Sequence, residues 1–294
     1  MQRLINEILE RAKADRQRIV LPEGTEERTL KAANQILTDG IADLILLGNP
    51  AEINACATEW GLGNISKATI IDPENNPKQE EYAQLLFELR KKKGMTIEEA
   101  RKLVTNPLYL GCLIIKNGDA DGQLAGARNT TGDVLRPALQ IIKSAHKDRG
   151  VSAALISVKD GEAYLLSDCA VVIDPTDKEL SDIALTSAET AIQFGIEPKI
   201  AMLSYSTRGS GKGDSVDKVR RATAMAQEAL KSPEYAGKGI ELDGEMQADA
   251  ALDAVVAKKK ASDSHVAGQA RVLIFPNLDA GNIGYKLLQR IGGC

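Results

Sequence analysis

The sequence is poor in residues on which several classes of protein depend. Only 3% of its 294 residues are aromatic, which disfavours a surface that stacks nucleic-acid bases. His146 and His265 are the only histidines and lie far apart, so a histidine-based zinc site or a Ser-His-Asp triad is not expected. The formal net charge is −4, so nucleic acid is not the expected partner.

Cysteines and long apolar runs are also scarce. The four cysteines form no C-x-x-C pair, and Cys56, Cys112 and Cys169 stand among apolar residues, which predicts that they are small core residues. The first ten residues carry charges throughout, and no apolar run approaches about 18 residues. We therefore expect neither a signal peptide nor a membrane span, and a reduced, cytoplasmic setting.

Short apolar runs alternate with amphipathic stretches along the chain, which predicts mostly parallel sheets flanked by helices. The predicted strands are 18–21, 43–47, 69–71, 153–158, 163–166, 170–173, 200–203, 239–242 and 272–275. The principal predicted helices are 25–37, 82–93, 133–147, 180–194, 216–231, 248–258 and 282–291. The length suits two α/β domains, which we place at 1–147 and 148–294, with ligands expected at the carboxyl ends of strands.

The most informative segment is Ala201–Ser215, which reads AMLSYSTRGSGKGDS. An apolar strand leads into hydroxyl residues, then into Arg208 and Lys212 among three glycines, and a helix follows. A strand, a glycine-rich turn and a helix in this order are typical of a phosphate-binding site. The spacing matches neither the P-loop nor the G-x-G-x-x-G fingerprint, so a flexible surface loop remains the alternative.

Three further segments have candidate site residues. In 126–136, Thr131 or Asp133 is predicted to cap a helix whose first turn contains Arg136; a cation there indicates either a bound anion or a surface ion pair. In 87–94, the cations that begin at Arg90 suit a helix end. In 277–290 a helix begins with Asn282 near its cap. The acidic stretch 239–249 matches no known metal loop and favours strand-end roles.

Taken together, these segments resemble the phosphate acetyltransferases of the phosphate acetyl/butyryltransferase family. LPEGTEERTL, FELRKKKGMT, TGDVLRPALQIIK, AMLSYSTRGS, DGEMQADAA and IFPNLDAGNIGYKLLQR occur in the family's order and approximate spacing across essentially the whole chain. The resemblance implies two α/β domains around an interdomain cleft, similar to the isocitrate and isopropylmalate dehydrogenase fold. It also implies a homodimer that transfers acetyl groups reversibly between CoA and phosphate, with CoA as substrate and no metal.

The resemblance also implies a set of substrate and CoA contacts. They are Arg28, Arg90, Thr130, Thr131, Arg136, Ser206, Thr207, Arg208, Ser210, Asn282, Tyr285, Lys286 and Arg290. Asn129 departs from the family pattern, in which a histidine is expected. The family's catalytic Ser, Arg and Asp are expected in a C-terminal tail beyond Cys294, so no catalytic residue is named here. Whether the sequence is truncated, incomplete or a natural short form stays open.

The implied reaction needs a CoA thiolate that attacks the acetyl carbonyl in a ternary complex, with donors for the oxyanion and cations for the departing phosphate. Two other activities stay open within related folds: a phosphate butyryltransferase, and an NAD-linked decarboxylating dehydrogenase. The dehydrogenases need clustered aspartates for a divalent metal, and Asp243 and Asp249 do not form a convincing cluster. A CoA-binding module without catalysis is a further alternative.

Overall fold

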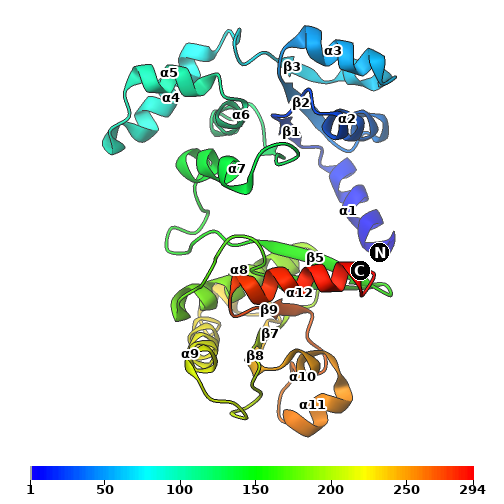
Figure 1. Cartoon of the computed structure of the whole chain (residues 1–294), viewed down its shortest axis with the longest axis vertical. Helices are drawn as coiled ribbons and strands as arrows, with labels where there is room; N and C mark the ends of the chain where they lie inside the picture. Colours follow the sequence, from blue (N-terminus) through cyan, green and yellow to red (C-terminus); the bar gives the residue numbers. More distant parts are fainter. Residues whose placement is uncertain (1) are drawn as a thin grey trace. The chain divides into compact units, whose positions relative to one another are not determined.

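The computed structural model describes residues 2–294, with side chains from Leu4 onward, and divides into two compact units (Figure 1). One unit comprises Asn6–Ala145, and the other comprises His146–Cys294 together with the start of the chain. The sequence predicts the break after residue 147. Each unit contains a mostly parallel sheet with packed helices, so the predicted α/β class is confirmed.

The sheet of the first unit has the strand order β3-β2-β1-β4, and its strands pair in parallel. The strands are β1 (Arg18–Leu21), β2 (Asp43–Leu47), β3 (Thr69–Ile71) and β4 (Gly122–Gln123). The helices are α1 (Gln2–Ala14), α2 (Glu27–Asp39), α3 (Pro50–Glu59), α4 (Gln79–Arg90), α5 (Ile97–Val104), α6 (Pro107–Lys116) and α7 (Thr131–Pro137). Short 3-10 turns cover Gly63–Lys67 and Lys91–Lys93, and a π-helical turn covers Ala138–Ile142.

Alternation along β1 divides the core of this unit between the two faces of the sheet. Leu21 packs in a cluster with residues of α2 and α3, such as Leu30 and Ile53. Its neighbour Val20 points to the opposite face and packs with residues of α4 and α6, such as Leu110. The carboxyl end of β1 is therefore held from both sides, which fixes the position of the chain that follows it.

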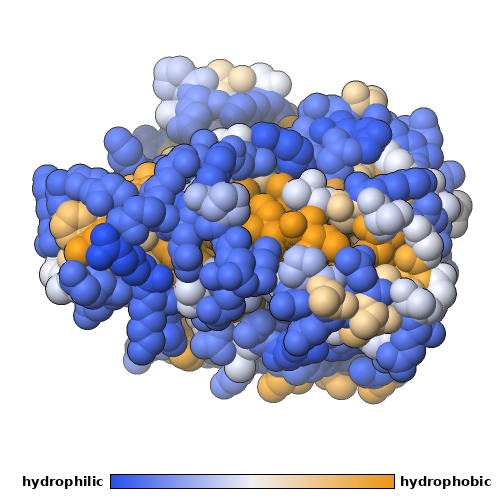
Figure 2. Space-filling view, turned by 90° about the horizontal axis from the view of Figure 1, so that it is seen from above, coloured by the Kyte–Doolittle hydropathy of each residue, from blue (hydrophilic) through white to orange (hydrophobic). Residues whose placement is uncertain are grey.

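Strand β3 forms an edge of this sheet and is only partly covered. Thr69 is exposed, and Ile70 and Ile71 are half-buried. The strand is drawn near the top of Figure 1, and Figure 2, which views the molecule from that side, shows apolar side chains in a band bordered by polar ones. A short edge strand exposes few unpaired backbone groups with which another chain could pair.

The sheet of the second unit has the order β5-β6-β9-β7-β8. Its strands are β5 (Ala154–Lys159), β6 (Glu162–Ser167), β7 (Lys199–Leu203), β8 (Glu241–Met246) and β9 (Val272–Ile274). Its helices are α8 (Asp177–Gln193), α9 (Asp214–Ala229), α10 (Ala248–Leu252), α11 (Ala254–Lys260) and α12 (Leu278–Arg290), with a 3-10 turn at Pro233–Tyr235. The predicted strands 153–158 and 163–166 are confirmed as β5 and β6, which pair antiparallel on either side of Asp160-Gly161.

Two apolar clusters stabilise this sheet. Met202 and Val272 pack with residues of α8 and α9 on one side, and Ala201 and Leu273 pack with residues of α10 and α11 on the other. Because β7 is buried between these layers, the position of its carboxyl end is fixed, and the glycine-rich loop begins there. None of the helices in the described chain combines the length and apolar character needed to cross a bilayer.

Several predicted elements differ from the structure. The predicted strand 170–173 is a loop, because its backbone N–H groups donate to the Asp168 carboxylate instead of to a neighbouring strand. The predicted helix 133–147 ends at Ile142. His146 therefore lies outside the helix, and its Nε2 lies 2.9 Å from Glu189 Oε2.

Two helix boundaries also differ. The stretch 248–258 contains two helices, because Asp253 ends α10 and its side chain accepts from Val255 N and Val256 N to cap α11. Helix α12 begins earlier than predicted, and its cap is Asn277, whose Oδ1 accepts from Ala280 N at 3.0 Å. Asn282 therefore lies inside the helix.

Candidate functional site

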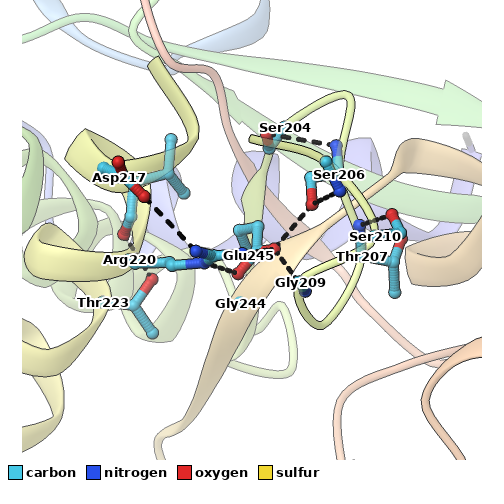
Figure 3. Close-up of polar contacts among 12 residues, drawn as sticks. Ser204, Ser206, Thr207, Gly209, Ser210, Asp217, Arg220, Thr223, Gly244 and Glu245 are labelled. Atoms are coloured by element: carbon cyan, nitrogen blue, oxygen red, sulfur yellow. Dashed lines mark hydrogen bonds and ion pairs between the residues drawn. The ribbon is translucent and has the colours of Figure 1, made fainter. Parts of the chain in front are cut away.

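The loop between β7 and α9, residues 204–213, folds around the carboxylate of Glu245. Glu245 Oε1 accepts from Ser206 Oγ at 2.7 Å and from Gly209 N at 2.8 Å. Arg220, on α9, donates from Nε to Oε2 at 3.0 Å and from Nη2 to Oε1 at 3.2 Å. Figure 3 shows these groups converging on Glu245 from the loop and from α9. The loop is thus assembled around an anion supplied by the chain itself.

The electrostatics of this arrangement favour a charged Glu245. The residue is 3% exposed, and burial alone would raise the pKa of its carboxyl. Hydrogen bonds from Arg220, Gly209 and Ser206 outweigh burial and lower that pKa from 4.5 to about 2. Glu245 therefore stays ionised at any pH at which the protein is expected to work.

A second layer of hydrogen bonds shapes the rest of the 204–213 loop. Ser206 Oγ, which donates to Glu245, accepts from Gly211 N at 2.9 Å. Thr207 Oγ1 accepts from Gln247 N at 2.9 Å, and Thr207 N donates to Ser210 Oγ at 3.0 Å. Ser206 and Thr207 are buried, whereas Arg208 and Ser210 are exposed. Of these four residues, only Arg208 and Ser210, the outer residues of the loop, therefore present side chains to solvent.

Two glycines are required by this geometry. Gly209 has φ +85°, a left-handed conformation that favours glycine, and its N–H donates to Glu245. A Cβ on Gly211 would lie 2.9 Å from Tyr205 Cε2 and 3.1 Å from Ser206 Cβ. In the sequence these glycines suggest a phosphate-binding loop. In the structure they let the loop backbone approach side chains of the same protein.

The outer residue Arg208 is held by acidic neighbours. Its Nη2 lies 2.7 Å from Asp243 Oδ2 and 3.4 Å from Asp263 Oδ2. Asp243 lies inside β8 and Glu245 near its carboxyl end, so the predicted strand-end role is confirmed for Glu245 alone. The guanidinium of Arg208 is exposed enough to meet a ligand, but it is already partly neutralised.

The first unit repeats this construction with Glu23, which follows β1. Its Oε2 accepts from Gly126 N at 3.0 Å and Ala127 N at 2.8 Å. Its Oε1 accepts from Arg128 N at 2.8 Å and from Asn129 through both the backbone N and Nδ2, at 2.9 and 2.8 Å. Asn129, which departs from the family pattern, thus has a defined hydrogen-bonding role.

Burial and hydrogen bonding act on Glu23 as they do on Glu245. Glu23 is 8% exposed, and burial would raise the pKa of its carboxyl. The donors of Arg128, Asn129 and Ala127 outweigh burial and lower that pKa from 4.5 to about 2. The 126–130 loop, which follows β4, is therefore also organised by a built-in anion.

Two predicted site residues lie on or beside the 126–130 loop. Arg28 donates to the backbone oxygen of Ala127, and its Nε donates to Glu26 Oε1 at 2.6 Å. Thr130 is the cap of α7: its Oγ1 accepts from Asp133 N at 3.3 Å and donates to Asp133 Oδ2 at 2.7 Å. The cap is predicted at Thr131 or Asp133, and the structure has it one or three residues earlier. Thr131 is the first helical residue and is exposed.

Arg136 lies in the last turn of α7, not in its first turn as predicted, so its charge does not oppose the helix dipole. Its side chain is exposed and has no hydrogen bond or ion pair within residues 2–294. A surface ion pair, the alternative that the sequence left open, is thus not formed in this part of the chain. The guanidinium remains available to an anionic ligand.

Arg90, at the end of α4, lines an open groove of about 850 Å³ in the first unit. Lys93, Lys102, Tyr109 and Gln140 also line the groove. Arg90 Nε is buried and has no hydrogen-bond partner in the described part of the chain. Buried polar groups are usually paired, so an unpaired guanidinium nitrogen in a basic groove indicates a place for an anion or a carbonyl oxygen.

The predicted residues of α12 are partly structural. Asn282 Nδ2 donates to the Cys169 backbone oxygen at 3.1 Å, in the loop that folds around Asp168. Lys286 Nζ lies 5.8 Å from the centre of the Tyr285 ring, and Lys286 and Arg290 are exposed. The predicted catalytic Ser, Arg and Asp lie outside the described residues.

Sequence reasoning missed the carboxylates that organise these loops: Glu23, Asp168 and Glu245. Each lies at or just past the carboxyl end of a strand, and Asp168 accepts from the N–H groups of Ala170, Val171 and Val172. The sequence did contain one signal: these loops hold many N–H donors, and the acceptors that those donors need are not provided by the loops themselves. The sequence alone does not show that an internal carboxylate meets this need.

Comparisons with known proteins agree on one family. A family model described as phosphate acetyl/butaryl transferase matches residues 3–294. A phosphate acetyltransferase of Clostridium acetobutylicum is 50% identical over 98% of this chain and 86% of its own length. One of Thermoanaerobacterium thermosaccharolyticum is also 50% identical, over 98% and 87%. A solved phosphotransacetylase of Streptococcus pyogenes matches with TM-score 0.91 and 40% identity, covering 100% of this chain and 87% of its own.

Proposed function

The chain belongs to the phosphate acetyl/butaryl transferase family, and we propose that it is a phosphate acetyltransferase. The reaction transfers an acetyl group reversibly between CoA and inorganic phosphate. The observation that carries the proposal is the match of the family across residues 3–294, together with 50% identity to named phosphate acetyltransferases. The oxidoreductase alternative is not favoured, because these relatives are acyltransferases.

The proposed substrates carry several negative charges, and the exposed or unpaired cations of the structure suit them. Arg90 offers an unpaired buried nitrogen in a basic groove, and Arg136 is exposed without an ion pair in the described chain. Guanidinium groups bind phosphate oxygens with well-defined geometry. We propose that Arg90 and Arg136 bind anionic parts of CoA or acetyl phosphate.

The remaining proposed contacts divide by exposure. The residues that offer an exposed side chain are Arg28, Thr130, Thr131, Arg208, Ser210, Lys286 and Arg290. Tyr285 and Asn282 are half-buried, and Ser206 and Thr207 are buried. We propose that the exposed members contact substrate, and that the buried pair supports the 204–213 loop from within.

The chemistry proceeds in a ternary complex in this proposal. The CoA thiolate attacks the acetyl carbonyl carbon, the bond between that carbon and the phosphate oxygen breaks, and phosphate leaves. Arginines stabilise the phosphate as its negative charge grows. CoA is then a substrate and not a bound cofactor. We also propose a cytoplasmic homodimer, following the family resemblance.

The test is the formation of acetyl-CoA from acetyl phosphate and CoA, followed by thioester absorbance, with butyryl phosphate as the matched alternative. We expect turnover with acetyl phosphate to exceed that with butyryl phosphate. Because one methylene changes discrimination by only about 1–3 kcal/mol, both substrates should be compared by kcat/KM. A higher kcat/KM for butyryl phosphate, or no turnover with either substrate by the folded protein, would contradict the proposal.

A further inference from the structure

The 204–213 loop and the 126–130 loop each fold around a carboxylate that the transfer chemistry does not use. In the 204–213 loop it is Glu245, and in the 126–130 loop it is Glu23. Both are nearly buried, at 3% and 8% exposed. A buried charge needs a structural or functional reason, because removing it from water is unfavourable unless strong hydrogen bonds compensate.

The donors of the 126–130 loop are already committed to Glu23. The consecutive N–H groups of residues 126–129 all donate to it, at distances between 2.8 and 3.0 Å. Consecutive N–H groups that converge in this way form an anion-binding nest. Because Glu23 fills the nest, these N–H groups do not bind the phosphate of a substrate.

The 204–213 loop uses Glu245 in the same way, with a side chain as an additional link. Gly209 N donates directly to Glu245, and Gly211 N reaches it through Ser206 Oγ. Arg220 balances the charge from α9, with its Nε 3.0 Å from Glu245 Oε2. The conformation of the loop from Ser206 to Gly211 is thus set by one anion and its donors.

We propose that Glu23 and Glu245 are positioning residues, each an internal anion around which a substrate-binding loop is assembled before substrate arrives. The phosphate of the substrate is then bound by side chains on the outer faces of the loops, and not by the nests. This inference rests on the proposed function, because it assigns each loop a part in substrate binding. A rigid loop holds its outer side chains ready, which reduces the ordering that binding requires.

The experiment removes the anion and supplies it again from solution. Glu245→Ala leaves a space shaped for a carboxylate, which acetate fits and the neutral acetamide fits equally in size. We expect Glu245→Ala to raise the KM for acetyl phosphate at least tenfold and to lower kcat. We expect acetate to restore both in a saturable way, and acetamide to restore neither. Glu241→Ala, at an exposed position of the same strand, is the matched control and should behave as wild type.

Glu245→Gln provides a second variant of nearly unchanged size. It keeps an acceptor oxygen for Ser206 and Gly209 but loses the charge that pairs with Arg220. We expect a raised KM for acetyl phosphate with a retained fold. If Glu245→Ala does not fold, this variant decides the matter. Wild-type kcat and KM in folded Glu245→Gln, or equal rescue of Glu245→Ala by acetamide and acetate, would overturn the proposal.

Hydrogen exchange separates this inference from the proposed function. The amide protons of Gly209 and Gly211 should exchange at least tenfold faster in Glu245→Ala, which removes the acceptor, than in wild type, with or without enzymatic activity. An inactive wild-type protein would overturn the proposed function, and the exchange rates of the two amides would still test the positioning role. Unchanged exchange of both amides in the variant would overturn the positioning role even in an active enzyme.

Discussion

Replacing Glu23 by glutamine tests how strongly the built-in anion stabilises its loop. In the folded chain the pKa of Glu23 falls from 4.5 to about 2, which corresponds to about 3 kcal/mol in favour of the charged, folded form. Glutamine lacks this charge and directs an N–H toward one side of a nest of N–H donors. A donor left unpaired costs about 1–3 kcal/mol. Because these effects overlap, we expect a local loss of about 2–4 kcal/mol.

Local hydrogen exchange is the appropriate assay, because a chain with two compact units need not unfold in a single transition. Protection of the amides of residues 126–129 should fall about 30- to 1000-fold in Glu23→Gln, since about 1.4 kcal/mol is one factor of ten. Glu27→Gln is the control, because Glu27 forms an exposed pair with Lys31 that contributes at most about 0.5 kcal/mol. Protection within threefold of wild type in Glu23→Gln would show that the charge of Glu23 does not stabilise the 126–130 loop.

Four further predictions follow from the same contacts. Both loop carboxylates keep a pKa of about 2 against 4.5 for an unfolded glutamate, so their stabilisation is complete above about pH 4.5 and is lost as pH falls toward 2; acid unfolding followed by circular dichroism should be shallower when both are glutamine. Gly211→Ala should lower activity, because its Cβ would meet the loop at 2.9 Å, whereas Gly63→Ala, with open space around it, should not. Arg136→Ala should raise the KM for CoA or acetyl phosphate and lower kcat while leaving the unfolding midpoint unchanged; unchanged kinetics would exclude a substrate role. Burial raises the pKa of Cys112 to about 11 and of Cys169 to about 12, so in mass spectra of native protein treated with iodoacetamide only the other two cysteines should be modified early; early labelling of either buried thiol would contradict its burial.

Most of the architecture could be predicted from patterns within short segments. Apolar runs such as 18–21 and 43–47 form strands because their side chains pack on both faces of a sheet. The sequence Thr96-x-x-Glu99 is typical of a capping box and forms one, because both of its hydrogen bonds are local. Predictions of this kind depend only on neighbouring residues, which the sequence displays directly.

Predictions that needed distant partners were less accurate. Residues 170–173 have the composition of a strand, but the nearby Asp168 accepts N–H groups of this segment. The distant partner is Gly281 of α12, which packs closely against the backbone oxygen of Asp168. The 204–213 loop has the composition of a phosphate seat, but its acceptor is Glu245, more than thirty residues later in the chain. Local sequence shows that donors are present and does not show which acceptor satisfies them.

Exchange of radiolabelled phosphate into acetyl phosphate tests whether the acetyl group passes directly between CoA and phosphate in a ternary complex. Transfer in a ternary complex predicts that label enters acetyl phosphate only when CoA is present, because the acetyl group must pass to the thiol before another phosphate can accept it. Exchange without CoA would indicate an acetyl-enzyme intermediate. Exchange without CoA, or no exchange when CoA is present, would contradict the account.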